Sequence, residues 1–386
     1  MRNDIDVLAF AADCAPVPPA DFVAALLRTG FSPEAYRDAY GDLRQQGMGA
    51  TDALAHYLRV GIHEQRPVSV RPDRRALAAL IRLPLADGDL MAQLVMSLLG
   101  RPLADAKPPF GAALTERWPL IRDLAREGAC PYVIAGDSHS SNYSLMGRRG
   151  GRWLVPLHLI CHGGSARGLG NPASRSGYGT ALREAVRTIR GLPCADDLPF
   201  LLQFGQVDIE FVHHFQRVRD GRHSLDLAEY RAFCATTLQR YIGFVTDLFE
   251  PSRRDNVHLV SVFPPALTDD AWRHGHLNDD IVRRESEMSR EELAAGIRGL
   301  EVANLAQRTA IHAAYNEALE AACRLHGFGY VDGFTPLLGA DGMLDPRYLI
   351  PEGHGFEHHV DSRRTYNVLS RLVWRIGGGG GEHADG

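Results

Sequence analysis

The sequence lacks a Cys-x-x-Cys pair, a regular cysteine spacing and any long apolar run. Its 6 cysteines are scattered through 386 residues. In a chain of this length, that pattern favours reduced, mostly buried thiols over a disulfide framework or a zinc site. The N-terminus has one early arginine and a broken apolar stretch, which makes a poor signal peptide. We therefore predict a cytoplasmic protein.

Basic and acidic residues are nearly balanced. The chain has 42 basic and 47 acidic residues, for a formal net charge of −5. Without a basic excess, the composition does not indicate a positively charged surface for a nucleic acid partner or an anionic membrane. No run approaches the roughly 18–20 apolar residues of a membrane span. The 45% hydrophobic content instead fits a globular protein, which is long enough for two or three domains.

Residues 1–105 carry short amphipathic segments separated by glycines, which predicts a helical N-terminal module. Within it, Phe31–Ser69 runs Tyr-x-x-x-Tyr-x-Asp, then His-Tyr-Leu-x-x-Gly, and closes on Glu-x-Arg-Pro. This pattern resembles a helical module found beside glycosyltransferases and other proteins of bacterial surface-polysaccharide production. The resemblance implies a biological setting and no chemistry. The same tyrosines would equally serve as the core of a small helical bundle.

From residue 125 onward, short apolar runs such as YVIAG, PFLLQFG and NVHLVSVF alternate with helical patterns. Near-continuous apolar strands separated by helices are typical of a parallel sheet covered on both faces. We predict a three-layer α/β domain over 125–376, after a proline-rich linker at 106–124 and before a flexible tail at 377–386. The charged segment 268–300 is either an insertion over a site or a solvated helical face.

Polar residues follow several of the predicted strands. Asp137, Ser138 and His139 come directly after YVIAG, and Gly205-Gln206-Val207-Asp208 follows PFLLQF. Near the C-terminus, Glu357-His358-His359 follows the strand-like GYVDGF. Ligands of open parallel sheets bind at the carboxyl ends of the strands. We therefore expect these three groups to meet at one edge of the sheet.

The order of these blocks resembles the SGNH/GDSL hydrolase family: Gly-Asp-Ser at the first strand, a glycine-rich loop, Gly-x-x-Asp after a central strand, and a late histidine. The resemblance covers about 250 residues in outline and implies a flavodoxin-like sheet. It implies that Ser138, next to Asp137, is the nucleophile and that a late histidine is the base. We assign His359 as base, with His358 as the alternative and Glu357 as the orienting carboxylate, since the family's Asp-x-x-His is missing here.

The resemblance also implies donors for the oxyanion: the Ser138 N–H, and a glycine N–H from ICHGGSARGLGNP, with Gly164 or Gly168 as candidates. The family's asparagine donor is replaced by Val207, whose side chain cannot donate. Gln206 or Asn142 would then have to supply that hydrogen bond. We expect two further residues near the substrate. His139, next to the nucleophile, is expected to line the pocket, and Asp208 is expected either to lie in the site or to hold loops together by accepting backbone N–H bonds. No metal or cofactor is implied.

Three other interpretations stay open. Asp137-x-His139 resembles the first motif of calcineurin-like metal phosphoesterases, although that family's other blocks are absent, and bound metal would distinguish it. A carbohydrate-binding or scaffold protein could retain the hydrolase fold without activity, with Asp137 and Ser138 merely capping a turn. An acyltransferase would use the same serine and histidine as an esterase. The predicted substrate is a small acyl ester, plausibly an O-acetyl group of a surface polysaccharide or its precursor.

Overall fold

The protein is described by a computed structural model, which covers residues 20–62, 110–126, 128–145, 147–149, 152–195, 197–350 and 357–377, with isolated residues between 66 and 80. Contacts divide the chain into two compact units. One comprises 1–105, 117–130 and 146–155, and the other comprises 106–116, 131–145 and 156–386. None of the described helices is both long and apolar enough to cross a membrane.

The first part of the chain is a set of short helices, as its sequence predicted. They are α2 (Ala20–Arg28), α3 (Pro33–Ala39), α4 (Gly41–Gln45) and α5 (Ala50–His56), followed by a π-helical turn at Tyr57–Gly61. Tyr36 and Tyr57 are buried, and the Phe31 and Tyr57 rings stack with centroids 4.5 Å apart. Gly61 is needed at its position, because a Cβ there would lie 2.3 Å from the Tyr36 hydroxyl oxygen.

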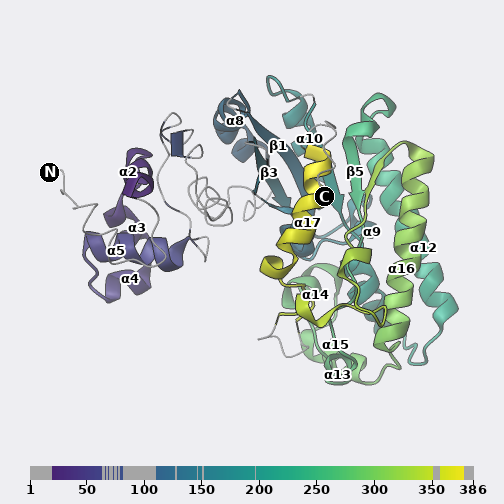
Figure 1. The fold of residues 1–386 in the computed structure, drawn as a ribbon. Helices are drawn as coiled ribbons and strands as arrows, with labels where there is room; N and C mark the ends of the chain where they lie inside the picture. The colour runs from purple at the N-terminus through teal and green to yellow at the C-terminus, as the bar shows by residue number, and fades with distance from the viewer. Residues whose placement is uncertain are drawn as a thin grey trace. The chain divides into compact units, whose positions relative to one another are not determined.

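A six-stranded sheet forms the centre of the α/β fold (Figure 1). Its order is β2-β3-β1-β4-β5-β6, with bounds β1 Ala129–Gly136, β2 Gly147–Arg149, β3 Arg152–Ile160, β4 Phe200–Gln203, β5 Val257–Val260 and β6 Gly329–Val331. β1, β4, β5 and β6 pair in parallel, while β2 and β3 form an antiparallel hairpin. Leaving out β2, this is the flavodoxin-like strand order. Ligands of such sheets bind at the carboxyl ends of the two neighbouring strands from which the chain continues to opposite sides of the sheet. Here these strands are β1 and β4.

Helices connect and cover the strands, which gives the predicted three-layer α/β arrangement (Figure 1). They are α8 (Phe110–Arg126), α9 (Ala166–Leu169), α10 (Tyr178–Arg190), α11 (His213–Arg219), α12 (Leu227–Leu248), α13 (Asp269–Arg273), α14 (Asp279–Glu285), α15 (Arg290–Arg298), α16 (Leu305–His326) and α17 (Ser362–Gly377). β1, β3, β4 and β5 are buried almost throughout, β4 at every position, because parallel sheets pack helices on both faces.

The structure differs from the predicted linker and agrees with the predicted state of the cysteines. Helix α8 occupies Phe110–Arg126 and so takes up most of the range 106–124, which the sequence predicts to be a linker. Its buried residues Leu114, Trp118 and Ile121 recur at helical spacing, which outweighs the proline at 119. The cysteine prediction is confirmed for the described residues, since Cys130, Cys161, Cys234 and Cys323 are buried, Cys194 is exposed, and none is in a disulfide.

Candidate active site

The turn after β1 carries the first group of polar residues. Asp137 caps a 3₁₀ turn at Ser138–Tyr143, with its side chain accepting the His139 N–H. The capping contact that was expected as an alternative role for Asp137 is therefore present. Asp137 and His139 are fully buried, whereas Ser138 is partly exposed. The turn thus presents the Ser138 hydroxyl at the carboxyl edge of the sheet.

Three side chains form a line from this hydroxyl into the C-terminal loop. Ser138 Oγ lies 2.7 Å from His359 Nε2, and His359 Nδ1 lies 2.6 Å from Glu357 Oε1. Glu357 Oε1 also accepts the His359 backbone N–H at 3.0 Å. Because the Glu357 carboxylate accepts at Nδ1, the Nδ1–H tautomer leaves His359 Nε2 with a lone pair facing the Ser138 hydroxyl. A proton can then move from oxygen to nitrogen in one step.

The electrostatics of the loop favour a neutral His359 and an ionised Glu357 near pH 7. Burial lowers the pKa of His359, and the hydrogen bond to Glu357 opposes that change. Hydrogen bonds from His358 and then His359 hold the pKa of Glu357 well below its usual range. Burial lowers the pKa of His358 to about 3. His359 is therefore neutral near pH 7, as a proton acceptor must be, beside an ionised carboxylate.

His358, the alternative base, lies differently. Its ring is buried, its Nδ1 lies 3.2 Å from Glu357 Oε1, and its Nε2 has no hydrogen-bond partner within the described part of the chain. The ring packs edge-on against Phe211, with centroids 5.3 Å apart. The structure therefore puts His359, and not His358, against Ser138 Oγ.

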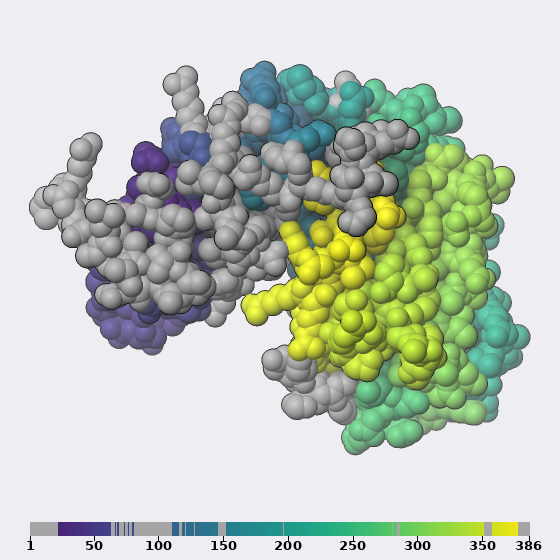
Figure 2. All heavy atoms as spheres, viewed as in Figure 1, coloured from purple at the N-terminus to yellow at the C-terminus, as the bar shows by residue number. Residues whose placement is uncertain are grey.

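A cavity of about 720 Å³ opens in front of Ser138 and His359. Besides these two, its lining includes polar side chains, three apolar ones and the N-terminal residues of α17: Ser141, Asn142, His162, Gly163, Asn278, Ile281, Ile350, Val360, Asp361, Ser362, Arg363 and Arg364. α17 lies at the surface of the molecule, in yellow in Figure 2. Asn278 and Ile281 belong to 268–300, so this segment contributes to the cavity as the insertion alternative expected.

Neither glycine named as an oxyanion donor has a free N–H. The Gly164 N–H donates to the Cys161 carbonyl at 2.7 Å, and the Gly168 N–H donates to Ser165 Oγ at 3.1 Å. These assignments are corrected by the structure, since both amides close local turns. Gly163, one residue before the first candidate, lines the cavity with Ser138. The sequence could not separate Gly163 from Gly164, because only the fold of the loop decides which amide faces the cavity.

The two side chains proposed to replace the asparagine donor are also engaged. Gln206 Nε2 donates to Glu210 Oε1 at 2.8 Å, while its Oε1 accepts the Phe263 N–H at 2.7 Å, so it braces the loop after β5. Asn142 Nδ2 donates to the His139 carbonyl at 3.2 Å. Asn142 lines the cavity, whereas Gln206 is buried away from it.

Val207 and Asp208 complete the block after β4. Val207 is fully buried in an apolar cluster that includes Phe211 and Trp272, so its side chain belongs to the core. Asp208 accepts the Ala166 N–H at 2.6 Å and the Arg167 N–H at 3.2 Å. It therefore holds the first turn of α9, which is the loop-holding role given above as its alternative to a place in the site.

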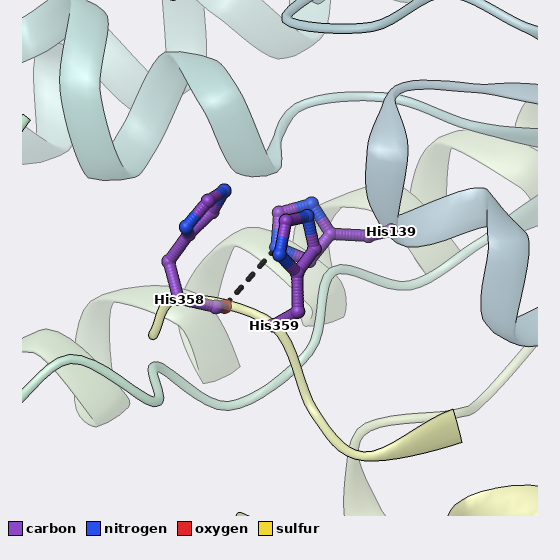
Figure 3. A group of neighbouring side chains, drawn as sticks. All are labelled: His139, His358 and His359. Atoms are coloured by element: carbon purple, nitrogen blue, oxygen red, sulfur yellow. Dashed lines mark hydrogen bonds between the residues drawn. The ribbon is translucent and has the colours of Figure 1, made fainter. Parts of the chain in front are cut away.

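His139 does not line the cavity as expected; it is fully buried beneath it. Figure 3 shows its ring beside that of His359, with the His358 ring to one side. The three histidines are the one group in the described residues whose side chains could together hold a metal ion, with ligand atoms within 4.8 Å of one another. In the structure, however, His139 binds Asp137 and His359 lies between Glu357 and Ser138. Metal binding would have to break these contacts.

Comparisons with known proteins give no family. No protein-family model matches the chain, and no curated protein does. Among solved structures, the chain is similar to an extracellular lipase from Streptomyces rimosus (14% identity, 63% of this chain and 99% of that chain, TM-score 0.32). It is also similar to phospholipase A1 from Streptomyces albidoflavus (13%, 64% and 100%, 0.30) and to a GDSL-like lipase from Bacteroides thetaiotaomicron (12%, 64% and 86%, 0.28). At these identities and TM-scores the likenesses support no conclusion about this chain.

Proposed function

We propose that the protein is a serine-dependent hydrolase of esters, with Ser138 as nucleophile, His359 as base and Glu357 as the carboxylate that orients the base. The observation that carries the proposal is the unbroken line from Ser138 Oγ to His359 Nε2 at 2.7 Å and from His359 Nδ1 to Glu357 at 2.6 Å. A serine hydroxyl is a weak nucleophile until a neutral histidine takes its proton. The cavity in front of the pair gives an ester access to it.

The chemistry follows from these three side chains. Ser138 Oγ attacks the acyl carbonyl carbon as its proton passes to His359 Nε2. The tetrahedral intermediate collapses, the bond to the alcohol breaks, and His359 returns the proton to the leaving oxygen. A second attack, by water or by another hydroxyl, then releases the acyl group from Ser138. Water as acceptor makes an esterase, and a sugar hydroxyl makes an acyltransferase.

The oxyanion is bound in this proposal by two backbone donors, the N–H groups of Ser138 and Gly163. Both residues line the cavity, whereas the amides of Gly164 and Gly168 are used within their turns. Val207, at the position of the family's asparagine donor, lies in the core, and the amides of Gln206 and Asn142 donate hydrogen bonds within the protein. Loss of one such donor typically costs about 10²–10³ in rate. We therefore expect a slow enzyme.

For the substrate, we propose a small acyl ester on a polar, sugar-like alcohol, such as an O-acetyl group of a surface polysaccharide or its precursor, met in the cytoplasm. The hydrogen-bonding groups of Ser141, Asn278 and Arg363 in the cavity suit such an alcohol. The biological setting rests on the resemblance of the N-terminal module. Release of acetate from acetylated oligosaccharides, compared with release of fatty acid from triglycerides, tests this proposal. Faster cleavage of the triglycerides would refute it.

The activity itself is tested by intact-mass measurement after exposure to a fluorophosphonate. We expect one adduct on the parent protein, none on Ser138→Ala, and an unchanged adduct on Ser140→Ala, a matched control from the same turn. Labelling that persists in Ser138→Ala would contradict the assignment. If the parent is not labelled, the carbohydrate-binding protein becomes the better proposal, which the burial of Val207 at the donor position favours.

A further inference from the structure

His139 has both ring nitrogens engaged in the protein interior. Its Nδ1 lies 2.9 Å from Asp137 Oδ1, and its Nε2 lies 3.2 Å from the His358 carbonyl oxygen. A carbonyl oxygen can only accept a hydrogen bond, so the second contact requires a proton on Nε2. The His139 side chain is not exposed at all and so does not contact a substrate.

The two contacts join the two halves of the candidate site. His139 follows Ser138 in the chain, and His358 precedes His359, so the bond from Nε2 links neighbours of the nucleophile and of the base across 219 residues (Figure 3). Resting on the proposed function, we propose that His139 is a positioning residue. It ties the nucleophile turn to the loop of the base and keeps His359 Nε2 in line with Ser138 Oγ.

The surroundings of His139 favour the doubly protonated ring that these two hydrogen bonds require. Burial by itself lowers the pKa of His139, but the charge and hydrogen bond of Asp137, with smaller contributions from Glu210 and the His358 carbonyl, outweigh it and raise the pKa. Burial raises the pKa of Glu210, which lies next to this group, to about 7. A doubly protonated imidazole donates to Asp137 and to His358 at once.

The charged ring also acts on the base. The rings of His139 and His359 have centroids 4.6 Å apart, and the positive charge of His139 lowers the pKa of His359. The other groups that face His359 are Glu357, which raises its pKa, and Asp137, which raises it less. His358 lies beside both rings and, by its low pKa, is neutral near pH 7.

Two substitutions separate the two bonds of His139. The glutamine amide nitrogen takes the place of histidine Nε2, so His139→Gln keeps a donor toward the His358 carbonyl and loses the one toward Asp137. The asparagine amide nitrogen takes the place of Nδ1, so His139→Asn does the reverse. Both remove the cation, and both leave a buried carboxylate without its charge partner, so their losses of stability are matched.

The experiment measures kcat and KM on 4-nitrophenyl acetate, the rate of fluorophosphonate labelling, and the Tm, for the parent and both variants. In His139→Asn we expect kcat and the labelling rate to fall about 100-fold, as displacement of a catalytic group by about 1 Å does, with KM little changed. In His139→Gln the loss is expected to be at least about tenfold smaller, at a similar Tm. In both variants the acid midpoint of kcat/KM moves to higher pH, because the cation beside His359 is gone.

Equal kcat in the two variants at equal Tm would overturn the proposal, since a purely structural histidine does not distinguish the two bonds. Should His139→Asn fail to fold, an unchanged acid midpoint in His139→Gln would overturn it. A parent protein that neither labels nor turns over the ester overturns the proposed function as well. The two failures are therefore distinguishable.

Discussion

Among the described residues, two serine–histidine contacts of nearly the same length come from one and the same turn. Ser138 Oγ lies 2.7 Å from His359 Nε2, and Ser140 Oγ lies 2.9 Å from His158 Nε2. The first pair lines the cavity, whereas Ser140 and His158 are buried. A short serine–histidine distance is therefore not enough to identify a nucleophile in this molecule.

The two pairs differ in which atom donates the hydrogen bond between serine and histidine. Ser140 Oγ donates its only proton to the Asp137 carbonyl at 2.6 Å, so His158 Nε2 must donate to Ser140 and cannot act as its base. At Ser138 the order is reversed, because Glu357 accepts at His359 Nδ1 and leaves Nε2 free to accept. A carboxylate behind the ring and a cavity in front of the hydroxyl distinguish the pair that we propose to be reactive.

The difference between the two serine–histidine pairs is tested most directly by Ser138→Ala. It removes the proposed nucleophile from a partly exposed position, so we expect turnover of a small ester to fall by at least about 10³-fold with the Tm nearly unchanged. Steady-state kinetics and thermal unfolding measure the two effects. Substantial turnover in this variant would show that the pair facing the cavity is not the reactive one.

The two adjacent histidines of the C-terminal loop give the second test. His359→Ala removes the proton acceptor, so we expect a loss about as large as that of Ser138→Ala. His358→Ala leaves the acceptor in place and empties a buried site against Phe211. We therefore expect a lower Tm and only a small loss of kcat. Equal kcat values in the two variants would refute the assignment of His359 as base.

Glu357→Gln converts the reactive pair toward the state of the buried one. The amide can donate to His359 Nδ1 and thereby favour the tautomer with a proton on Nε2, which cannot accept from Ser138. A comparable carboxylate-to-amide change in a serine protease costs about 10⁴ in kcat, and we expect a loss on the order of 10²–10⁴ here. A kcat within about twofold of the parent would exclude Glu357 from orienting the base.

The pH dependence should show the neutral state of His359. Because burial lowers the pKa of His359, this side chain gains its proton only as pH falls below the usual histidine value of about 6.5. Activity requires the neutral form, so kcat/KM is expected to fall on the acid side with a midpoint below about 6.5, about tenfold per pH unit. A midpoint above about 7 would show that the charged form is favoured instead.

Ser140→Ala should have the smallest effect on activity. It removes buried hydrogen bonds to Asp137 and His158, which typically contribute about 1 kcal/mol each to stability, and it removes no reacting atom. We expect a lower Tm with kcat within about threefold of the parent. A loss of kcat as large as that of Ser138→Ala, with the Tm unchanged, would point to the buried pair.

Much of the site could be predicted from the order of residues along the chain. The parallel sheet followed from continuous apolar runs, and the pairing of Ser138 with His359 was implied by the resemblance in the order of the Gly-Asp-Ser block and the late histidine. The oxyanion donors could not be predicted, because an amide's hydrogen bond depends on the shape of its turn: Gly164 and Gly168 donate within their own loop. The burial of His139 was missed for a similar reason, since a residue beside a nucleophile can point either way from a 3₁₀ turn.

The contact between Ser138 and His359 closes a loop of 221 residues. The entropy needed to close a loop grows with its length, and contacts this distant in sequence slow folding and depend on the elements between them. A chain whose sheet has formed but whose last segment has not docked would have native-like secondary structure and an inert serine. The reactivity that we propose for Ser138 would therefore report complete folding, and a local opening of the C-terminal loop would suffice to abolish it.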